Sequence, residues 1–183
     1  METNPWKILN TKEIYQNPWI KVDEHKVLNS KGNEGIYGTI HFKNLAIGIL
    51  PLDEYYNTWI VGQYRFPIKQ YSWEIPEGGG NRMVPALESA QRELLEETGI
   101  IAKEYTKIQE MYLSNSASDE RAILYLARKL EFVAPQPEES EVLQIKKVPF
   151  EELYQLVLKG SILDSLTVTA VLKIKLMMLK GEL

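Results

Sequence analysis

The 183-residue sequence contains no cysteine, and this absence excludes several kinds of chemistry at once. Disulfides, thiolate metal sites and cysteine nucleophiles are all ruled out, so packing and hydrogen bonds must stabilise the fold. We therefore expect no structural zinc site. Catalysis, if the chain performs any, has to come from other side chains.

Long apolar runs are also absent. No window reaches the ~20 apolar residues that a membrane span needs, and the first six residues lack a basic region followed by an apolar stretch. These features predict a cytoplasmic protein that has no membrane partner.

Charge of one sign does not dominate the chain. Lysine and arginine number 21 against 25 acidic residues, which gives a net charge of -4. The charges are mixed along the sequence without a basic stripe, so nucleic acid is not an expected partner and a small molecule is. A hydrophobic fraction of 44% suits one main core.

Apolar patterning and turn signals predict a mixed α/β or α+β architecture. The first forty residues resemble hairpins, with a turn at residues 29–33, and residues 45–50 and 59–64 are β-prone and expected to pair. A glycine turn follows at 76–80. Further strands are expected at 108–113, 122–130 and 143–148, and helices at 85–98, 151–159 and 165–180. Helices that cover a mixed sheet fit this order.

The helix at residues 85–98 is the best-defined element in the sequence. Pro85 suits a first helical position and Gly99 suits a C-terminal cap. Glu93 and Glu97 lie one turn apart and share a face, with Glu96 beside them. Both ends and the acidic face of this helix thus carry local signals.

Three crowded carboxylates repel one another unless a cation or an arginine compensates them. Arg92 can offset only part of this charge, and oxygen ligands favour hard cations such as Mg²⁺ or Mn²⁺. A solvated acidic face is the competing interpretation, and for such a run alone it would be the commoner one. The neighbouring glycine run, which lets the backbone approach a ligand, favours a metal site that acts on a phosphoanhydride.

These motifs resemble the signature of the Nudix hydrolase family. Gly78 matches its first glycine, and residues 92–100, which read RELLEETGI, match its second half throughout. The chain departs from the pattern at Val84, where the family has a glutamate, and Glu88 stands one helical turn before the arginine as a substitute. The resemblance implies a Nudix fold, in which a mixed sheet is sandwiched between helices.

The resemblance also implies roles for individual residues. Glu93, Glu96 and Glu97 would be catalytic residues that bind the metal or support its bound water. Glu77 would offer its backbone carbonyl to the metal, for which Mg²⁺ is expected and Mn²⁺ is an alternative.

Within the family, the chain is similar to ADP-ribose and nucleoside diphosphate sugar pyrophosphatases. The segments that carry this likeness are residues 63–67 (QYRFP), 73–78 (WEIPEG) and 118–121 (SDER). It implies an N-terminal antiparallel β-element over residues 1–44, exchanged between the subunits of a homodimer, and a Nudix hydrolase domain over residues 45–183.

Substrate-binding residues are expected outside the helix. By resemblance Arg65 would contact a phosphate and Glu74 the ribose or sugar, although a salt bridge between these two is an equal alternative. Trp19 and Tyr15 are candidates for stacking the base, with a core or dimer-contact role as the other interpretation.

The acidic loop at residues 135–141, which reads PQPEESE, stands where related enzymes keep a mobile catalytic glutamate. We favour Glu139 as the general base and Glu141 as a further metal ligand, with an exchange of these two roles as the alternative. Glu120 is a weaker contender. His25 and His41 fall in expected N-terminal strands, where single histidines are usually structural.

The expected function is metal-dependent hydrolysis of a nucleoside diphosphate sugar to a nucleoside monophosphate and a sugar phosphate. Many ADP-ribose pyrophosphatases carry Ser-Pro-Gly where residues 114–117 read SNSA, so a GDP-mannose type of substrate competes with ADP-ribose. Two alternatives remain open: hydrolysis of nucleoside triphosphates or dinucleoside polyphosphates, and a Nudix module that binds a nucleotide without cleaving it.

Overall fold

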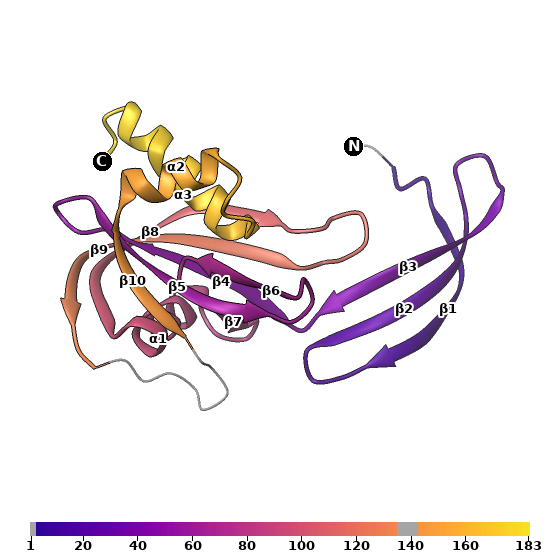
Figure 1. Ribbon diagram of the computed structural model, residues 1–183. Coiled ribbons are helices and arrows are strands. Elements are labelled where there is room, and N and C mark those ends of the chain that lie inside the picture. The colour runs from indigo at the N-terminus through magenta and orange to yellow at the C-terminus, as the bar shows by residue number, and fades with distance from the viewer. Residues whose placement is uncertain (1–2, 135–142) are drawn as a thin grey trace. The chain divides into compact units, whose positions relative to one another are not determined.

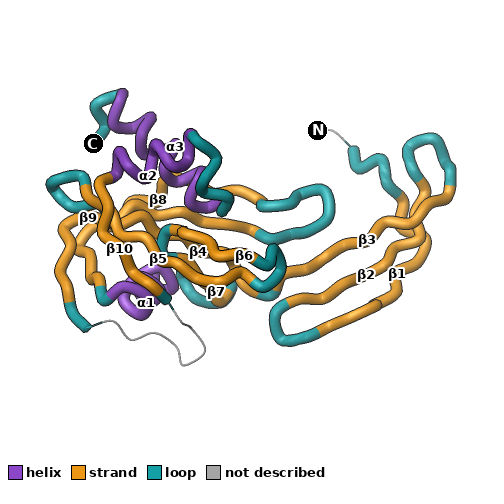
Figure 2. Tube along the Cα trace, viewed as in Figure 1, coloured by secondary structure: helices purple, strands orange, loops and turns teal. Residues whose placement is uncertain are grey.

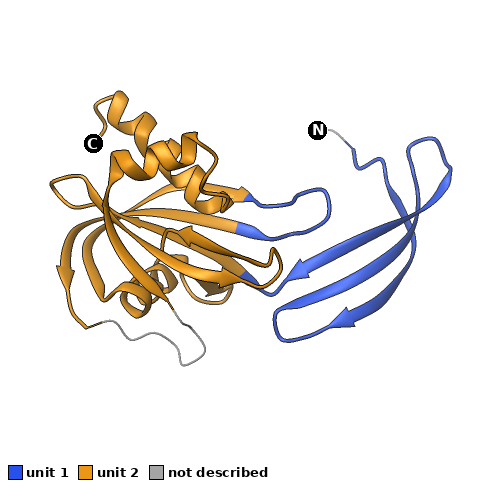
Figure 3. Cartoon of the chain, in the orientation of Figure 1, with its two compact units in different colours: residues 1–44, 112–121 blue, residues 45–111, 122–183 orange. Residues whose placement is uncertain are grey.

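A computed structural model describes residues 3–134 and 143–183. The chain forms two compact units, coloured separately in Figure 3. The N-terminal unit comprises residues 1–44 and 112–121, and the second unit comprises residues 45–111 and 122–183. We call the second unit the helical unit because it contains the three helices of the described chain.

The N-terminal unit is a three-stranded antiparallel sheet in the order β1-β2-β3 (Figure 1). Its strands are β1 (Lys7–Gln16), β2 (Ile20–Leu28) and β3 (Glu34–Phe42). Asn17 and Asn29 build the two turns, because each side-chain amide oxygen accepts two backbone N–H groups of its own turn. The expected N-terminal hairpins are therefore confirmed.

The helical unit contains ten elements arranged around two sheets (Figure 2). The elements are β4 (Asn44–Pro51), β5 (Asn57–Arg65), β6 (Gln70–Glu74), β7 (Glu77–Asn81), α1 (Ala86–Thr98), β8 (Ile100–Tyr112), β9 (Arg121–Phe132), β10 (Gln144–Pro149), α2 (Phe150–Leu158) and α3 (Ser165–Leu179). One sheet has the order β10-β5-β6 and the other β7-β4-β9-β8. The predicted mixed α+β class is confirmed, since β4 and β9 are parallel while β5 runs antiparallel to β6 and β10.

The expected pairing of residues 45–50 with residues 59–64 is wrong. β4 pairs with β7 and β9, whereas β5 belongs to the other sheet. An isolated bridge between Leu52 and Thr58 joins the end of β4 to the start of β5. Asp53 explains the tight connection, because its carboxylate accepts the backbone N–H groups of Tyr55 and Asn57. The two strands then diverge into different sheets, each with other partners.

The segment expected to be a glycine turn is a strand instead. β7 covers residues 77–81 and lies at the edge of the sheet beside β4. Gly80 shows why small residues are used here, since a Cβ atom on it would lie 2.8 Å from a side-chain carbon of Ile47. Close packing of β7 against β4 therefore requires glycine. Because glycine is also typical of turns, the sequence predicted a turn here.

The core of the helical unit lies between the sheets and the helices. α1 lies on one side of the sheets, and α2 and α3 lie on the other (Figures 1 and 2). Ile47 and Ile49 pack with Ala90 and Leu94 of α1 in one cluster. β4 is thus a strand buried on both faces, since Gly48 between them faces the Leu166 side chain of α3.

The predicted C-terminal end of α1 is confirmed, and the helix begins one residue later than predicted, at Ala86. Pro85 is the N-cap residue, and Gly99 adopts the left-handed conformation with φ 68° and donates its N–H to the Leu95 carbonyl. Among the described residues, no helix combines the length and apolar character that crossing a membrane requires.

Candidate functional site

The carboxylates of Glu93 and Glu97 turn inward from α1. Both residues are buried, with 8% and 2% of their surface exposed, although ionised carboxylates normally remain in water. The i, i+4 spacing that the sequence indicated therefore places them on the buried face, beside Leu94. Burial of two acids on one helix points to a function, because it costs free energy unless a cation or donors compensate the charge.

Gly78 in β7 leaves room for the Glu93 carboxylate. A Cβ atom at position 78 would lie 2.2 Å from Cδ of Glu93 and 2.4 Å from either of its oxygens, which is far inside van der Waals contact. Any side chain would displace the carboxylate. The glycine of the motif is thus required by the side chain of a glutamate fifteen positions later.

Arg92 compensates two of the helix carboxylates. Its guanidinium donates to Glu93 and, at 2.5 Å, to Glu96, and it also donates to the Gly79 carbonyl at 3.1 Å. Burial acts to lower the pKa of Arg92, but the charges of Glu93 and Glu96 outweigh it and raise the pKa. This arginine therefore ties α1 to the glycine run and offsets the charge of both carboxylates.

Glu97 bonds to the same run from one turn further along. Its Oε2 accepts the backbone N–H of Glu77 at 2.9 Å. Hydrogen bonds from a backbone N–H stabilise the ionised form of a carboxylate. The start of β7 is consequently held between Glu93 and Glu97 of the helix.

Arg65 lies at the end of β5 and forms a fork with two further acids. Its Nε donates to both Glu74 oxygens at 3.1 and 3.0 Å, and its Nη2 donates to Glu74 at 2.5 Å and to Glu77. Glu74 is buried, with 2% of its surface exposed. The salt bridge between Arg65 and Glu74 that the sequence left open is therefore present, and a substrate role for either residue stays a prediction.

Burial governs the charge state of this second cluster. Burial raises the pKa of Glu77 well above its usual value, and the neighbouring charges of Asp164 and Glu74 add to the rise. One of its oxygens, Oε2, is buried without a hydrogen-bond partner. Desolvation acts to lower the pKa of Arg65, but Glu74 and Glu77 outweigh it and raise the pKa.

Asp164 and Thr167 connect this cluster to the start of α3, and the sequence analysis missed both. Asp164 caps the helix by accepting from the Thr167 N–H at 2.6 Å and from its hydroxyl at 2.7 Å. The same hydroxyl accepts the Ile75 N–H at 2.9 Å. The β6–β7 connection is thus fixed by α3 as well as by α1.

The structure gathers the acids differently from the sequence prediction. Glu74, Glu77 and Asp164 each offer a carboxylate oxygen, and these oxygens lie within 4.8 Å of one another. Among the described residues, Glu93, Glu96 and Glu97 of α1 do not form such a group. Arg92 forms ion pairs with both Glu93 and Glu96. A capping Asp before an apolar helix was the one local signal that could have pointed to Asp164.

Three expected site residues are not among the side chains described above. Trp19 belongs to the N-terminal unit, where 65% of its surface is exposed. Glu139 and Glu141 lie outside the described residues. The general base therefore stays a prediction.

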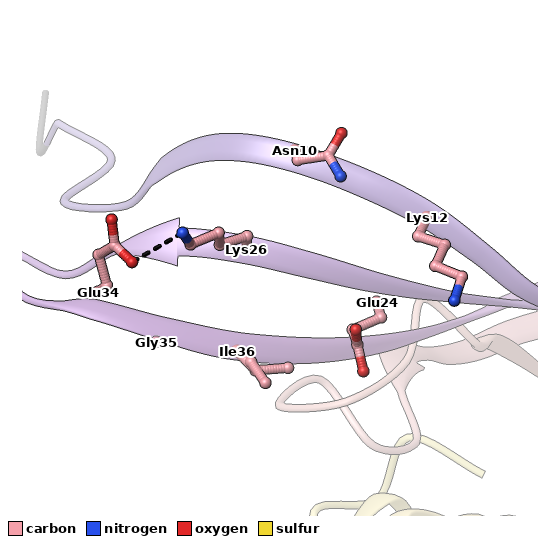
Figure 4. A pocket seen from close by; sticks show the side chains of 7 residues that line it. All are labelled: Asn10, Lys12, Glu24, Lys26, Glu34, Gly35 and Ile36. Atoms are coloured by element: carbon pink, nitrogen blue, oxygen red, sulfur yellow. Dashed lines mark ion pairs between the residues drawn. The ribbon is translucent and has the colours of Figure 1, made fainter.

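A hollow of about 390 Å³ lies on the sheet of the N-terminal unit (Figure 4). Its lining comprises Asn10, Lys12, Glu24, Lys26, Glu34, Gly35 and Ile36. Lys26 and Glu34 form an ion pair of 2.8 Å across it. Its charges are mixed in sign, so it does not resemble a phosphate site.

Comparison with known protein families identifies the family of this chain. The NUDIX domain profile matches residues 43–166, which is more than half of the chain. The chain belongs to the Nudix family. A second profile, described as the nucleoside diphosphate sugar hydrolase N-terminal domain, matches residues 6–40. The resemblance inferred from the motifs is therefore confirmed.

Individual Nudix relatives agree with this assignment. The chain is 31% identical to an ADP-ribose pyrophosphatase of Bacillus subtilis (strain 168) over 128 residues, which cover 69% of each protein. It is 30% identical to an ADP-ribose pyrophosphatase of Mycobacterium tuberculosis (strain ATCC 25618 / H37Rv), over 70% of this chain and 64% of the relative. The solved structure of an ADP compounds hydrolase has a TM-score of 0.87 and 20% identity, over 100% of this chain and 98% of that one, and it confirms the fold.

The Nudix assignment explains why α1 and β7 are so tightly joined. Both fall inside the matched domain, as do Glu93, Glu97 and Gly78. The predicted class of enzyme, a Nudix hydrolase acting on pyrophosphate bonds, is confirmed. Nudix enzymes in general use divalent metal ions.

Proposed function

We propose that this Nudix protein hydrolyses the pyrophosphate of a nucleoside diphosphate linked to a sugar, with ADP-ribose as the first candidate. The observation that carries the proposal is the pair of buried carboxylates, Glu93 against Gly78 and Glu97 hydrogen-bonded to the Glu77 N–H. The products are a nucleoside monophosphate and a sugar phosphate. Cleavage between the two phosphates requires water, attacking in line with the leaving oxygen.

Mg²⁺ fits the donor set of the helix, with Mn²⁺ as the alternative. Glu93, Glu96 and Glu97 supply carboxylate oxygens, which hard cations prefer, and the missing side chain of Gly78 leaves the backbone open beside them. When bound, such an ion polarises phosphate oxygens and acidifies bound water. The role of Glu77 as a backbone-carbonyl ligand and of Glu141 as a further ligand belongs to the same proposal.

The protein's own residues hold the site in register. Arg92 donates to the carboxylates of Glu96 and Glu93, and the Glu77 N–H orients Glu97. Arg65 already donates hydrogen bonds to Glu74 and Glu77 through its Nε and Nη2 groups, so it neutralises these two carboxylates. Contact of Arg65 with a phosphate, of Glu74 with the sugar and of Trp19 with the base complete the proposed substrate site, and Glu139 is the proposed base.

The substrate class rests on the relatives and on the N-terminal profile. Both curated relatives are ADP-ribose pyrophosphatases, and the N-terminal match is to nucleoside diphosphate sugar hydrolases. Residues 114–117 depart from the Ser-Pro-Gly run of many ADP-ribose enzymes. For this reason a GDP-mannose type of substrate is tested beside ADP-ribose.

A homodimer is part of the proposal, with residues 1–44 as the contact element. Within the described part of the N-terminal unit, Val27 is the one hydrophobic residue that is buried. The large apolar residues exposed there are Trp6, Ile8, Leu9, Ile14, Tyr15, Trp19, Ile36 and Tyr112. So many exposed apolar side chains in one small unit favour a protein partner, and a second copy is the partner that the family resemblance implies.

The proposal is tested by incubating the pure protein and Mg²⁺ with ADP-ribose, GDP-mannose, UDP-glucose or a dinucleoside polyphosphate. We expect monophosphate release from a diphosphate sugar. Glu97→Gln should lower kcat by about 100-fold or more, since outer-shell changes alone cost roughly 10–100-fold at metal sites. Glu152→Gln, at an exposed position of α2 outside the motif, is the control and should retain activity.

Other outcomes would redirect the proposal. Preferred cleavage of the dinucleoside polyphosphate, or of nucleoside triphosphates, would replace the sugar-nucleotide assignment. If neither Mg²⁺ nor Mn²⁺ supports cleavage of any substrate while nucleotides still bind, the chain is a binding module. Light scattering during size-exclusion chromatography measures the subunit number, and a monomer at all concentrations would refute the homodimer.

A further inference from the structure

The N-terminal unit brings together both histidines of the chain and a buried aspartate. Asp23 and His25 are two residues apart on β2 and therefore share a face, and His41 lies on the adjacent strand β3, where its Cα is paired with that of Lys21. One carboxylate oxygen of Asp23 and one ring nitrogen of each histidine lie within 4.8 Å of one another. The sequence predicted two separate structural histidines, and the fold instead makes them neighbours.

His41 lies between two carboxylates. Its Nε2 is 3.3 Å from Oδ2 of Asp23, and its Nδ1 is 3.1 Å from Oδ2 of Asp119 in the 112–121 segment of the same unit. A neutral imidazole carries one N–H and can therefore donate to one carboxylate, while its other nitrogen turns a lone pair toward the second. A cation at Nε2 removes that conflict, and it can be a proton or a metal ion.

His25 is oriented in the way that metal-bound histidines are. Its Nδ1 is 2.9 Å from the Thr11 hydroxyl, and its Nε2 is 2.8 Å from the Thr39 hydroxyl, which also lies 3.2 Å from Nε2 of His41. The single hydroxyl proton of Thr39 can serve one of these two nitrogens. Each ring thus has its Nδ1 held by a side chain while its Nε2 points to a shared centre, which is the outer-shell pattern of metal ligands.

Lys21 forms an ion pair with Asp23. Its Nζ lies 2.7 Å from Oδ2 of Asp23, whose side chain is only 5% exposed, while that of Lys21 is 36% exposed. Lys21 can therefore turn into solvent without disturbing the sheet. A metal ion would displace this flexible ammonium and the Thr39 hydroxyl, which lies 2.8 Å and 3.2 Å from the two Nε2 atoms.

We propose that Asp23, His25 and His41 form a binding site for one divalent transition metal ion of the Zn²⁺ or Co²⁺ kind. Two imidazole nitrogens and one carboxylate oxygen are donors that such ions accept, whereas Mg²⁺ prefers oxygen alone. The site needs no thiolate, so it revises the expectation, drawn from the missing cysteines, that structural zinc is absent. It belongs to residues outside the matched NUDIX domain.

The proposed ion would stabilise the N-terminal unit. It joins β2 to β3 directly. Through His41 it also supports Asp119, whose other oxygen accepts the Phe42 N–H at 2.8 Å. The 112–121 segment is thereby secured to the sheet from which it accepts hydrogen bonds.

The chain contains only these two histidines, which makes the test specific. The full-length protein is saturated with Mg²⁺, so that oxygen sites are filled, and titrated with Zn²⁺ at constant pH while the imidazole proton signals are followed by NMR. We expect both imidazole signals to change together and to reach their end point at one equivalent. Titration with Co²⁺ should produce visible absorption bands at the same stoichiometry.

Variants separate this site from the glutamate helix. His25→Gln and His41→Gln should each weaken Zn²⁺ binding by at least 10-fold, whereas Glu97→Gln should leave it unchanged. Lys21→Met removes the competing ammonium and should tighten binding, a gain that misfolding cannot produce. Circular dichroism checks that each variant keeps its fold.

Two results would overturn the proposal. One is imidazole signals that respond to pH but not to ten equivalents of Zn²⁺, which would make a proton the cation at His41. The other is Zn²⁺ binding that survives His41→Gln and is lost in Glu97→Gln, which would assign the metal to α1.

Discussion

β1 and β5 have ten and nine residues, yet they show opposite burial. Every residue of β1 is exposed, whereas Thr58 and the four residues after it in β5 are all buried. The difference follows from their surroundings, since helices cover the sheets of the helical unit and β1 is an edge strand of a single sheet. One unit carries its own core, and the other presents apolar residues that a partner would have to cover.

Glycine substitutions should show the comparison at its strongest. Gly78→Ala places a Cβ atom 2.2 Å from the Glu93 carboxyl carbon and must displace it. We expect kcat to fall by about 100-fold, the cost that a displacement of roughly 1 Å can have in an active site. Hydrolysis rates measure the effect. Gly38→Ala in β3 meets no atom within 4 Å and is the matched control. Equal losses in both variants would contradict this account.

Large-to-small substitutions should separate the two units in stability. Leu94→Ala, at a fully buried position of α1, should lower the free energy of unfolding by about 2–5 kcal/mol. Ile36→Ala, at a position 73% exposed, should change it by less than about 0.5 kcal/mol in the monomer. Urea denaturation followed by circular dichroism provides the values. A loss at Ile36 that grows with protein concentration would indicate that a second copy covers it.

The hydroxyl of Thr167 offers a finer test of how the helical unit holds its site. Thr167→Val keeps the shape but leaves the buried Ile75 N–H without its acceptor, which should cost about 1–3 kcal/mol of unfolding free energy. A role in positioning Glu74 and Glu77 further predicts a lower kcat with little change in KM. Thr169→Val, two residues further along α3 and partly exposed, is the control. An unchanged kcat would restrict Thr167 to a structural role.

The smallest effect concerns pH and Glu77. Because burial raises its pKa in the folded state, the folded protein binds more protons than the unfolded chain between the usual pKa and the raised one. Stability should therefore fall as pH rises through that window, by at most about 1.4 kcal/mol per pH unit for one proton. Glu77→Gln removes this slope and becomes the more stable form at the upper end. Denaturation at several pH values with EDTA tests it, and Glu88→Gln should retain the slope.

Local patterns predicted the elements whose signals lie within the element itself. Pro85 and Gly99 marked both ends of α1, because caps depend on a few adjacent residues. The strand at β7 was misread as a turn, and β4 was assigned the wrong partner, because strand pairing is set by residues far apart in sequence. A run of glycines fits both a turn and a closely packed strand, and only packing against Ile47 and Glu93 distinguishes the two structures.

The sequence by itself determined the acidic face of α1, since Glu93 and Glu97 are one turn apart on any helix, and it determined the family through the same run. Only the tertiary structure decided that Arg65 neutralises Glu74 and Glu77, that Asp164 joins them, and that both histidines meet at Asp23. The physical reason is distance along the chain. Helix periodicity is a property of neighbours, whereas these clusters form when separate strands and loops pack side by side.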